Sequence, residues 1–172
     1  MSEAAEDRAR ALIGKTLGAK YFLEALIGQG AMGAVFRARG PGGRKVAVKT
    51  LSAELMRSDA AQRFVRESEV VRGLQHPHVV PTLDAGVDQQ SGLLFLVMPL
   101  QRGRNLDHVL DELGALEPEN AVRIALQAAK GLRAAHRLGV IHRDVKPGNL
   151  ILDEEDQEIV VRVCDFGIAK RL

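Results

Sequence analysis

The stretch His142-Arg143-Asp144-Val145-Lys146-Pro147-Gly148-Asn149 places five polar side chains in one short loop between two predicted strands, residues 140–141 and 150–152. A second polar motif, Asp165-Phe166-Gly167, follows the predicted strand 159–163. Asp144, Asn149 and Asp165 together supply hard oxygen ligands and a further carboxylate. Mg²⁺ prefers such donors and completes its shell with water and substrate phosphates. These two motifs therefore predict a magnesium-dependent phosphate site.

Two charged residues lie at positions where the pattern predicts burial. Lys49 takes an inward position in the predicted strand 45–51, and Glu67 lies on the apolar stripe of a helix predicted from Ser58 or Asp59 to about Gln75. A buried charge is costly unless it is paired. Lys49 and Glu67 are therefore candidate partners; the alternative is that Glu67 lies at the edge of the stripe and reaches water.

A glycine-rich turn, Gly28-Gln29-Gly30-Ala31-Met32-Gly33, separates the predicted strands 21–27 and 34–39. A dinucleotide fingerprint would require a helix after the glycines, and a strand follows instead. Backbone N–H groups of such a hairpin can still approach a phosphate closely, because no side chains stand in the way. The alternative is a hairpin tip without a ligand.

The remaining pattern predicts strands 79–83 and 93–98, then helices 105–113 and 118–138. Five strands with one inserted helix thus precede a mainly helical region that ends in short strands. This order is typical of an α+β chain in two unequal parts. Residues 1–20 are expected to be a polar lead-in.

Composition excludes several functional classes. The 172 residues carry 24 Lys and Arg against 22 Asp and Glu, a net charge of +2, which argues against nucleic-acid binding. Cys164 is the single cysteine, so no internal disulfide or CxxC zinc motif exists. There is no apolar run of roughly 20 residues that would span a membrane. With a charged N-terminus and no apolar signal region, a cytoplasmic location is expected.

Five motifs in order make the chain resemble a eukaryotic-type serine/threonine protein kinase. They are the glycine loop ending in Val35, Val46-Ala47-Val48-Lys49, the helix residue Glu67, H-R-D-x-K-x-x-N at 142–149, and D-F-G at 165–167. Lys146-Pro147 is similar to the Ser/Thr-specific branch, and the glycine-loop region to bacterial members. The resemblance implies a two-lobe fold: a five-stranded N-lobe with one helix at 21–98, a hinge at 99–101 and a partial helical C-lobe at 102–172.

The same resemblance implies the site residues. ATP would contact Ile27, Gly28, Gly30, Gly33, Val35, Ala47, Lys49, Met98, Pro99 and Gln101, with Glu67 fixing the Lys49 side chain. Asn149 and Asp165 would bind Mg²⁺. Asp144 would accept or orient the substrate hydroxyl proton, and Lys146 would neutralise the transferring phosphoryl group. His142 is expected to be a packing and hydrogen-bonding scaffold.

The chain ends five residues after Gly167, so we expect a kinase core cut short, with weak activity or none. The predicted helix 118–138 supports this expectation. It is apolar around most of its circumference, and such a helix is normally buried by several neighbouring elements. The implied partners are a protein with Ser or Thr and another kinase chain, as homodimer or heterodimer. Two alternatives stay open: a non-catalytic nucleotide-binding or regulatory fragment, and a small-molecule phosphotransferase, which Lys146-Pro147 argues against.

Overall fold

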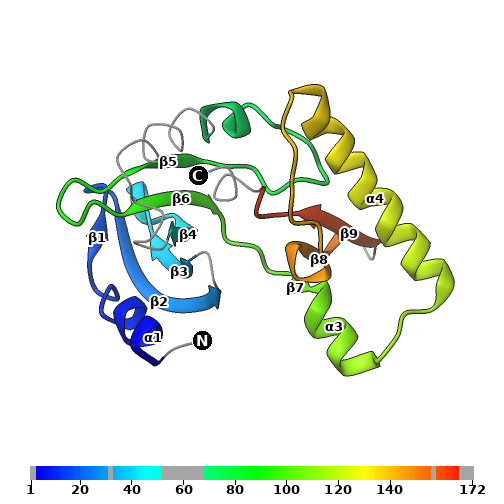
Figure 1. Ribbon diagram of the computed structural model, residues 1–172, viewed down its shortest axis with the longest axis horizontal. Coiled ribbons are helices and arrows are strands. Elements are labelled where there is room, and N and C mark those ends of the chain that lie inside the picture. Colours follow the sequence, from blue (N-terminus) through cyan, green and yellow to red (C-terminus); the bar gives the residue numbers. More distant parts are fainter. Residues whose placement is uncertain (1–2, 31–32, 52–67, 156–157, 167–172) are drawn as a thin grey trace. The chain divides into compact units, whose positions relative to one another are not determined.

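The computed structural model describes residues 3–30, 33–51, 68–155 and 158–166 of the chain. The described residues form two compact units (Figure 1). Of the described residues, the first unit holds those up to residue 69 and residues 82–100, and the second holds residues 70–81 and those from 101 to 166. The composition of helices and strands is α+β, as the sequence predicts.

The first unit is built on a six-stranded antiparallel sheet with the order β1-β2-β3-β4-β6-β5 (Figure 1). Its strands are β1 (Thr16–Leu17), β2 (Tyr21–Gly30), β3 (Gly33–Arg39), β4 (Lys45–Leu51), β5 (Asp84–Val87) and β6 (Leu94–Pro99). A short 3-10 turn, η1 (Pro41–Gly43), joins β3 to β4. The predicted strands at 34–39, 45–51 and 93–98 are confirmed within a residue at either end.

The N-terminal segment differs from the expected polar lead-in, because it contains helix α1 (Glu3–Arg10) and strand β1. Ala9 and Leu17 are buried in the same core as Phe36 and Val48. β1 pairs with the start of β2, with Thr16 opposite Phe22. The apolar positions in this segment are too few and too widely spaced to show a period, so only packing on the sheet identifies them as core residues.

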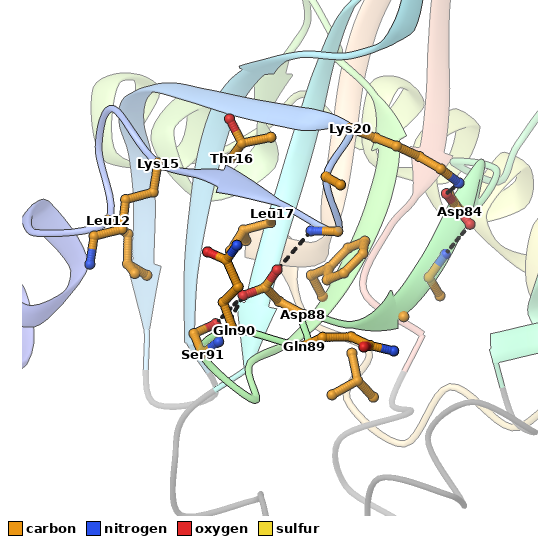
Figure 2. Close-up of a pocket in the computed structure, with 16 residues that line it drawn as sticks. Leu12, Lys15, Thr16, Leu17, Lys20, Asp84, Asp88, Gln89, Gln90 and Ser91 are labelled. Atoms are coloured by element: carbon orange, nitrogen blue, oxygen red, sulfur yellow. Dashed lines mark hydrogen bonds and ion pairs between the residues drawn. The ribbon is translucent and has the colours of Figure 1, made fainter.

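The turn after β1 is tied to the far edge of the same sheet. Gly18 N–H donates to the carboxylate of Asp88 at 2.9 Å, and the Tyr21 hydroxyl donates to Asp84 at 2.7 Å. The Lys20 ammonium lies 3.5 Å from the same Asp84 carboxylate (Figure 2). The two edge strands, β1 and β5, are thus joined by side chains.

The predicted strand at 79–83 is wrong. Val79 and Val80 belong to the second unit, where Val80 N–H donates to the carbonyl of Val163. Leu83 belongs to the first unit, and the strand there begins at Asp84. A continuous apolar run looks the same whether it fills one core or is divided between two, so the pattern placed the strand five residues too early.

Among its described residues, the second unit contains two full α-helices, a short helical stretch and a three-stranded sheet with the order β7-β8-β9. The short stretch is residues 68–72, of which 70–72 belong to this unit; most of the helix predicted from Ser58 or Asp59 to about Gln75 lies outside the described residues. The strands are β7 (Arg104–Asn105), β8 (Leu150–Glu155) and β9 (Glu158–Val163), and the helices are α3 (Leu106–Leu113) and α4 (Pro118–Arg137). Both predicted helices are confirmed within a residue, although Asn105 makes no side-chain cap hydrogen bond. The predicted strand at 140–141 is not formed. No helix among the described residues is long and apolar enough to cross a membrane.

Helix α4 buries one stripe of small and apolar residues, which are Ile124, Ala128, Gly131 and Ala135. Their spacing of three to four residues matches one helical face. Gly131 permits a close approach, because a Cβ there would lie 2.4 Å from the carbonyl oxygen of His78. Other apolar residues of the helix face water, with Val122 67% exposed.

Candidate active site

The glycine motif lies on the β2–β3 hairpin, with Gly28 opposite Val35 and Gly30 opposite Gly33. Residues 31–32 at the tip lie outside the described part of the chain. The ladder has an irregularity between Leu26 and Gly28, which makes Ile27 the extra residue of a bulge. Bulges bend a strand and redirect side chains, and they are frequent beside functional sites.

The three glycines have different local environments. At Gly33, φ is +140° and a Cβ would lie 1.8 Å from the carbonyl oxygen of Thr50. At Gly30 a Cβ would meet nothing within 4 Å, and at Gly28 it would make only ordinary contact with Val35. Gly33 is therefore required by packing against β4, which the sequence did not show. Packing alone does not demand glycine at the other two positions.

Lys49 lies on β4 between two neighbouring strands, opposite Val35 of β3 and Leu96 of β6. The residue is only 8% exposed. Ala47, also buried, lies opposite Met98, and Val46 lies opposite Pro99. These predicted site residues are thereby placed on adjacent strands of one sheet. Glu67, the predicted partner of Lys49, lies outside the described residues.

The loop 142–149 forms a compact cluster in the second unit. The Lys146 ammonium lies 3.0 Å from Oδ2 of Asp144. Nδ2 of Asn149 donates to the backbone carbonyl of Asp144 at 2.8 Å and to Oδ2 of Asp144 at 3.2 Å. Asn149 is buried at the end of η3 (Pro147–Asn149). The structure thus brings together three predicted site residues around one carboxylate.

His142 is buried under this loop, with only 1% of its surface exposed, and it holds the loop by hydrogen bonds. Its Nε2 lies 2.8 Å from the carbonyl oxygen of Cys164, and its Nδ1 lies 3.2 Å from the backbone N–H of Asp144. Nε2 must donate and Nδ1 must accept, which assigns the neutral Nε2–H tautomer. The ring of Phe166 packs on the imidazole with centroids 4.7 Å apart. His142 is the scaffold that the sequence predicted.

Two residues beside this cluster have left-handed backbone conformations, Arg143 with φ 63° and Asp165 with φ 60°. Such angles are uncommon for non-glycine residues and are concentrated at active sites and ligand clamps. Cys164 N–H donates to the carbonyl of Asn149 at 3.0 Å, so the segment before Asp165 is held against the loop. Asp165 and Asn149, the predicted metal ligands, consequently belong to neighbouring, hydrogen-bonded segments.

Asp107 is a neighbour of the loop that the sequence analysis missed. A Cβ on Gly148 would lie 2.5 Å from Oδ2 of Asp107, so the carboxylate covers the backbone of η3. Asp107 lies 41 positions earlier in the chain, in the first turn of α3. No local pattern connects residues so far apart.

A cavity of about 1020 Å³ in the first unit lies between the β1 turn and the loop after β5 (Figure 2). None of the predicted site residues lines it. Within the described residues, no three His, Cys, Asp or Glu side chains cluster as a metal site. A cation at the loop would therefore depend on Asp165, the amide of Asn149 and oxygens of a phosphate ligand.

Comparison with known sequences agrees with this arrangement of hairpin, buried lysine and polar loop. The model of the protein kinase domain matches residues 21–172. The chain belongs to the protein kinase family. The sheet of the first unit is accordingly the kinase N-lobe sheet, with six strands among the described residues instead of the expected five.

The most similar curated kinases include bacterial enzymes. The chain is 41% identical to serine/threonine-protein kinase pkn3 of Myxococcus xanthus over 161 residues, which are 92% of this chain and 29% of that protein. It is 41% identical to serine/threonine-protein kinase PknH of Mycobacterium tuberculosis over 171 residues, 98% of this chain and 26% of that one. This chain thus spans less than a third of the length of either relative.

Solved kinase structures have the same fold. The kinase domain of PknI from Mycobacterium tuberculosis superposes with a TM-score of 0.78 and 33% identity, over 90% of this chain and 61% of that one. The structure of Rad53 1-466 in complex with AMP-PNP gives a TM-score of 0.74 and 26% identity, over 87% of this chain and 38% of that one. The kinase fold class expected from the sequence is thereby confirmed.

Proposed function

We propose that this chain is the nucleotide-binding and catalytic part of a serine/threonine protein kinase, which transfers the γ-phosphate of ATP to a Ser or Thr hydroxyl of a protein. The observation that supports this most directly is the Asp144 carboxylate, whose Oδ2 contacts both Lys146 and Asn149. The names of the bacterial relatives, which are serine/threonine-protein kinases, support the choice of hydroxyl substrate.

In this proposal Asp144 accepts or orients the proton of the attacking hydroxyl. Lys146 and Asn149 hold the carboxylate in one orientation, and the Lys146 ammonium also offsets negative charge on the transferring phosphoryl group. Phosphoryl transfer proceeds through a loose transition state, so positioning and charge stabilisation supply most of the rate enhancement. His142 positions the loop and takes no part in proton transfer, because both of its ring nitrogens are already hydrogen-bonded.

We expect the nucleotide to contact the strands of the N-lobe sheet and the residues that follow β6. In the N-lobe, Lys49 would contact the phosphates under the glycine hairpin, and Ile27, Val35, Ala47 and Met98 would surround the adenine. The Pro99 carbonyl and the Gln101 N–H would hydrogen-bond the adenine edge. A cation on a buried strand is a fitting phosphate partner, since it is already desolvated.

The side chains near the loop fit Mg²⁺. Nδ2 of Asn149 donates to Asp144, which leaves its Oδ1 as the donor atom for a cation. Asp165 would add a carboxylate oxygen. Asn149 and Asp165 would hold Mg²⁺ at this loop, where its positive charge would offset the negative charge of the phosphates.

The test is phosphate transfer by the 172-residue chain, with labelled ATP, Mg²⁺ and casein as acceptor. Asp144→Asn should abolish transfer, whereas Asp111→Asn, an exposed carboxylate on α3, should leave it unchanged. Binding of a fluorescent ATP analogue is measured separately with Lys49→Met and with Lys15→Met as its control. Nucleotide binding without transfer would support the non-catalytic alternative, and transfer that survives Asp144→Asn would overturn the assigned role.

A further inference from the structure

A row of exposed side chains crosses three strands of the N-lobe sheet. Phe22 on β2 lies opposite Arg39 on β3, and Arg39 lies opposite Lys45 on β4. Directly paired residues lie on the same face of a sheet, and so do residues two apart on one strand, which adds Arg37. Phe22, Arg37, Arg39 and Lys45 are defined here as the β2–β4 patch.

The β2–β4 patch concentrates positive charge. Arg39 and Lys45 are like charges directly across a strand pair, an arrangement that destabilises a sheet. Glu24 is the one carboxylate in contact with the patch, 2.6 Å from Nη2 of Arg39 and 3.4 Å from Nε of Arg37, within the described residues. Lys45 makes no ion pair with any part of the chain that the structure describes. Two of the three cations therefore share one carboxylate and the third has none among the described residues, in a chain whose net charge is only +2.

A bulge positions that carboxylate. The register shifts between Leu23 and Ala25, so Glu24 is the extra residue of β2. The hydrogen bond from Arg39 keeps the pKa of Glu24 below its ordinary value, so the group remains a carboxylate. The bulge thereby fixes the two guanidinium groups beside each other before any partner binds. Ordering long cationic side chains in advance lowers the entropy cost of binding.

The patch also has an apolar floor. A depression of about 470 Å³ is lined by Ile13, Gly14, Phe22, Leu23, Glu24, Arg37, Arg39 and Lys45. Phe22 is 44% exposed and Ile13 is 41% exposed. Exposed apolar side chains rimmed by charges are characteristic of protein interaction sites.

We propose that the β2–β4 patch docks an acidic segment of a partner protein. Carboxylates of the segment would pair with Arg37, Arg39 and Lys45, and one apolar side chain would pack on Phe22. Three cations would neutralise too few phosphates to hold a nucleic acid at physiological salt, whereas a protein segment also gains from the apolar floor. Arg37 lies opposite Ala47 on β4, so the patch lies on the same face of the sheet as the proposed adenine contacts and adjoins them.

Binding is tested with the whole 172-residue chain and a short fluorescein-labelled peptide, rich in Asp and Glu and with a central Leu. Fluorescence anisotropy should show saturable binding, which a peptide with Asn and Gln in place of the acids should lack. The double variant Arg39→Gln/Lys45→Gln should weaken binding about 10-fold or more, and Phe22→Ala several-fold. The control Arg123→Gln/Lys130→Gln removes the same charge from exposed positions of α4 and should have little effect.

Circular dichroism spectra show whether each variant folds. If the double variant does not fold, peptide binding is measured with Lys45→Gln alone. Absence of peptide binding to the wild-type chain would overturn the proposal, as would equal weakening by the α4 control. Single-stranded DNA and phosphatidylserine vesicles of comparable charge are tested in parallel. If one of them binds more tightly than the peptide and loses binding in the same patch variants, that ligand, and not an acidic protein segment, is the occupant of the patch. None of these measurements depends on phosphate transfer, so the proposed kinase activity stands or fails separately.

Discussion

Nδ1 of His142 accepts the backbone N–H of Asp144 across 3.2 Å, while its Nε2 donates to the carbonyl of Cys164. One buried imidazole thereby joins the loop that carries Asp144 to the segment that carries Asp165. Each hydrogen bond uses a different ring nitrogen, so only the neutral Nε2–H form satisfies both. The side chain orients two functional segments without contacting the reacting groups.

Replacing His142 by Ala should reduce stability and activity together. The change removes two buried hydrogen bonds and the contact with Phe166, and we expect a loss of about 2–4 kcal/mol. Urea unfolding followed by circular dichroism measures the loss. His136→Ala on the exposed side of α4 is the matched control, and equal destabilisation by both would contradict the scaffold role.

Gly33→Ala and Gly30→Ala should separate packing from ligand binding in the same hairpin. The new methyl at position 33 would meet the Thr50 carbonyl at 1.8 Å, so we expect overpacking and strain of about 2–3 kcal/mol or more. Gly30→Ala meets nothing within 4 Å and should change stability by less than about 1 kcal/mol. Thermal unfolding and binding of a fluorescent ATP analogue are compared for both.

In that comparison, Gly30→Ala should weaken nucleotide binding while unfolding as the wild type does. If both variants unfold like the wild type, the close approach of β3 to β4 at Gly33 is wrong.

Asp88 should make the N-lobe sensitive to acid. The hydrogen bond from the Ser91 hydroxyl, followed by that from Gly18 N–H, lowers the pKa of the Asp88 carboxyl. Because the pKa is lowered in the folded state, the Asp88 carboxylate contributes its full stabilisation above the pKa of the unfolded chain, about 3.9. This stabilisation is lost as the pH falls through the pKa of the folded chain. Asp88→Asn should cost about 1–3 kcal/mol at neutral pH and flatten the loss of stability below about pH 4.

Urea unfolding at a series of pH values measures this difference, with the exposed Asp111→Asn as control. An Asp88→Asn chain that loses stability as steeply as the wild type would show that Asp88 contributes nothing to the acid transition.

Gln127 should stabilise the second unit through the edge of β9. Its Nε2 donates to the Ile159 carbonyl at 2.9 Å, and its Oε1 accepts from Val161 N–H at 2.9 Å. Gln127→Leu leaves both backbone groups without this partner and should cost about 1–3 kcal/mol. Arg123→Ala, one turn earlier and exposed, is the control for helix propensity. Hydrogen exchange at the Val161 amide should speed up in the first variant only.

The local pattern of apolar residues predicted much of the fold, because in several strands and helices it continues over the whole element. The β-branched run of β4 and the helical spacing of α4 predicted nearly the observed bounds of both elements. The prediction for His142, which came from the resemblance to kinases, was also correct, since both ring nitrogens are hydrogen-bonded within the described loop. The catalytic and binding roles of Asp144, Lys146, Lys49 and Asn149 remain predictions that the proposed assays test.

The errors share one cause, which is that burial depends on distant residues. The pattern of helix 118–138 assigned no partner to Gln127, but β9 accepts and donates hydrogen bonds to that side chain. The segment before Tyr21 reads as a polar lead-in, but Ala9 and Leu17 pack into the sheet core. Neither partner lies within a window that local periodicity samples.

The sequence by itself determined which donors, cations and carboxylates are available for the proposed chemistry, because the ordered motifs from Gly28 to Asp165 specify them. It also determined the α+β class, since strand and helix periods differ along the chain. Only the tertiary structure decided that Gly33 is a packing residue, that Gln127 holds β9 and that Phe22, Arg39 and Lys45 form one surface. These relations depend on cross-strand register and helix docking, which join residues that the chain itself keeps apart.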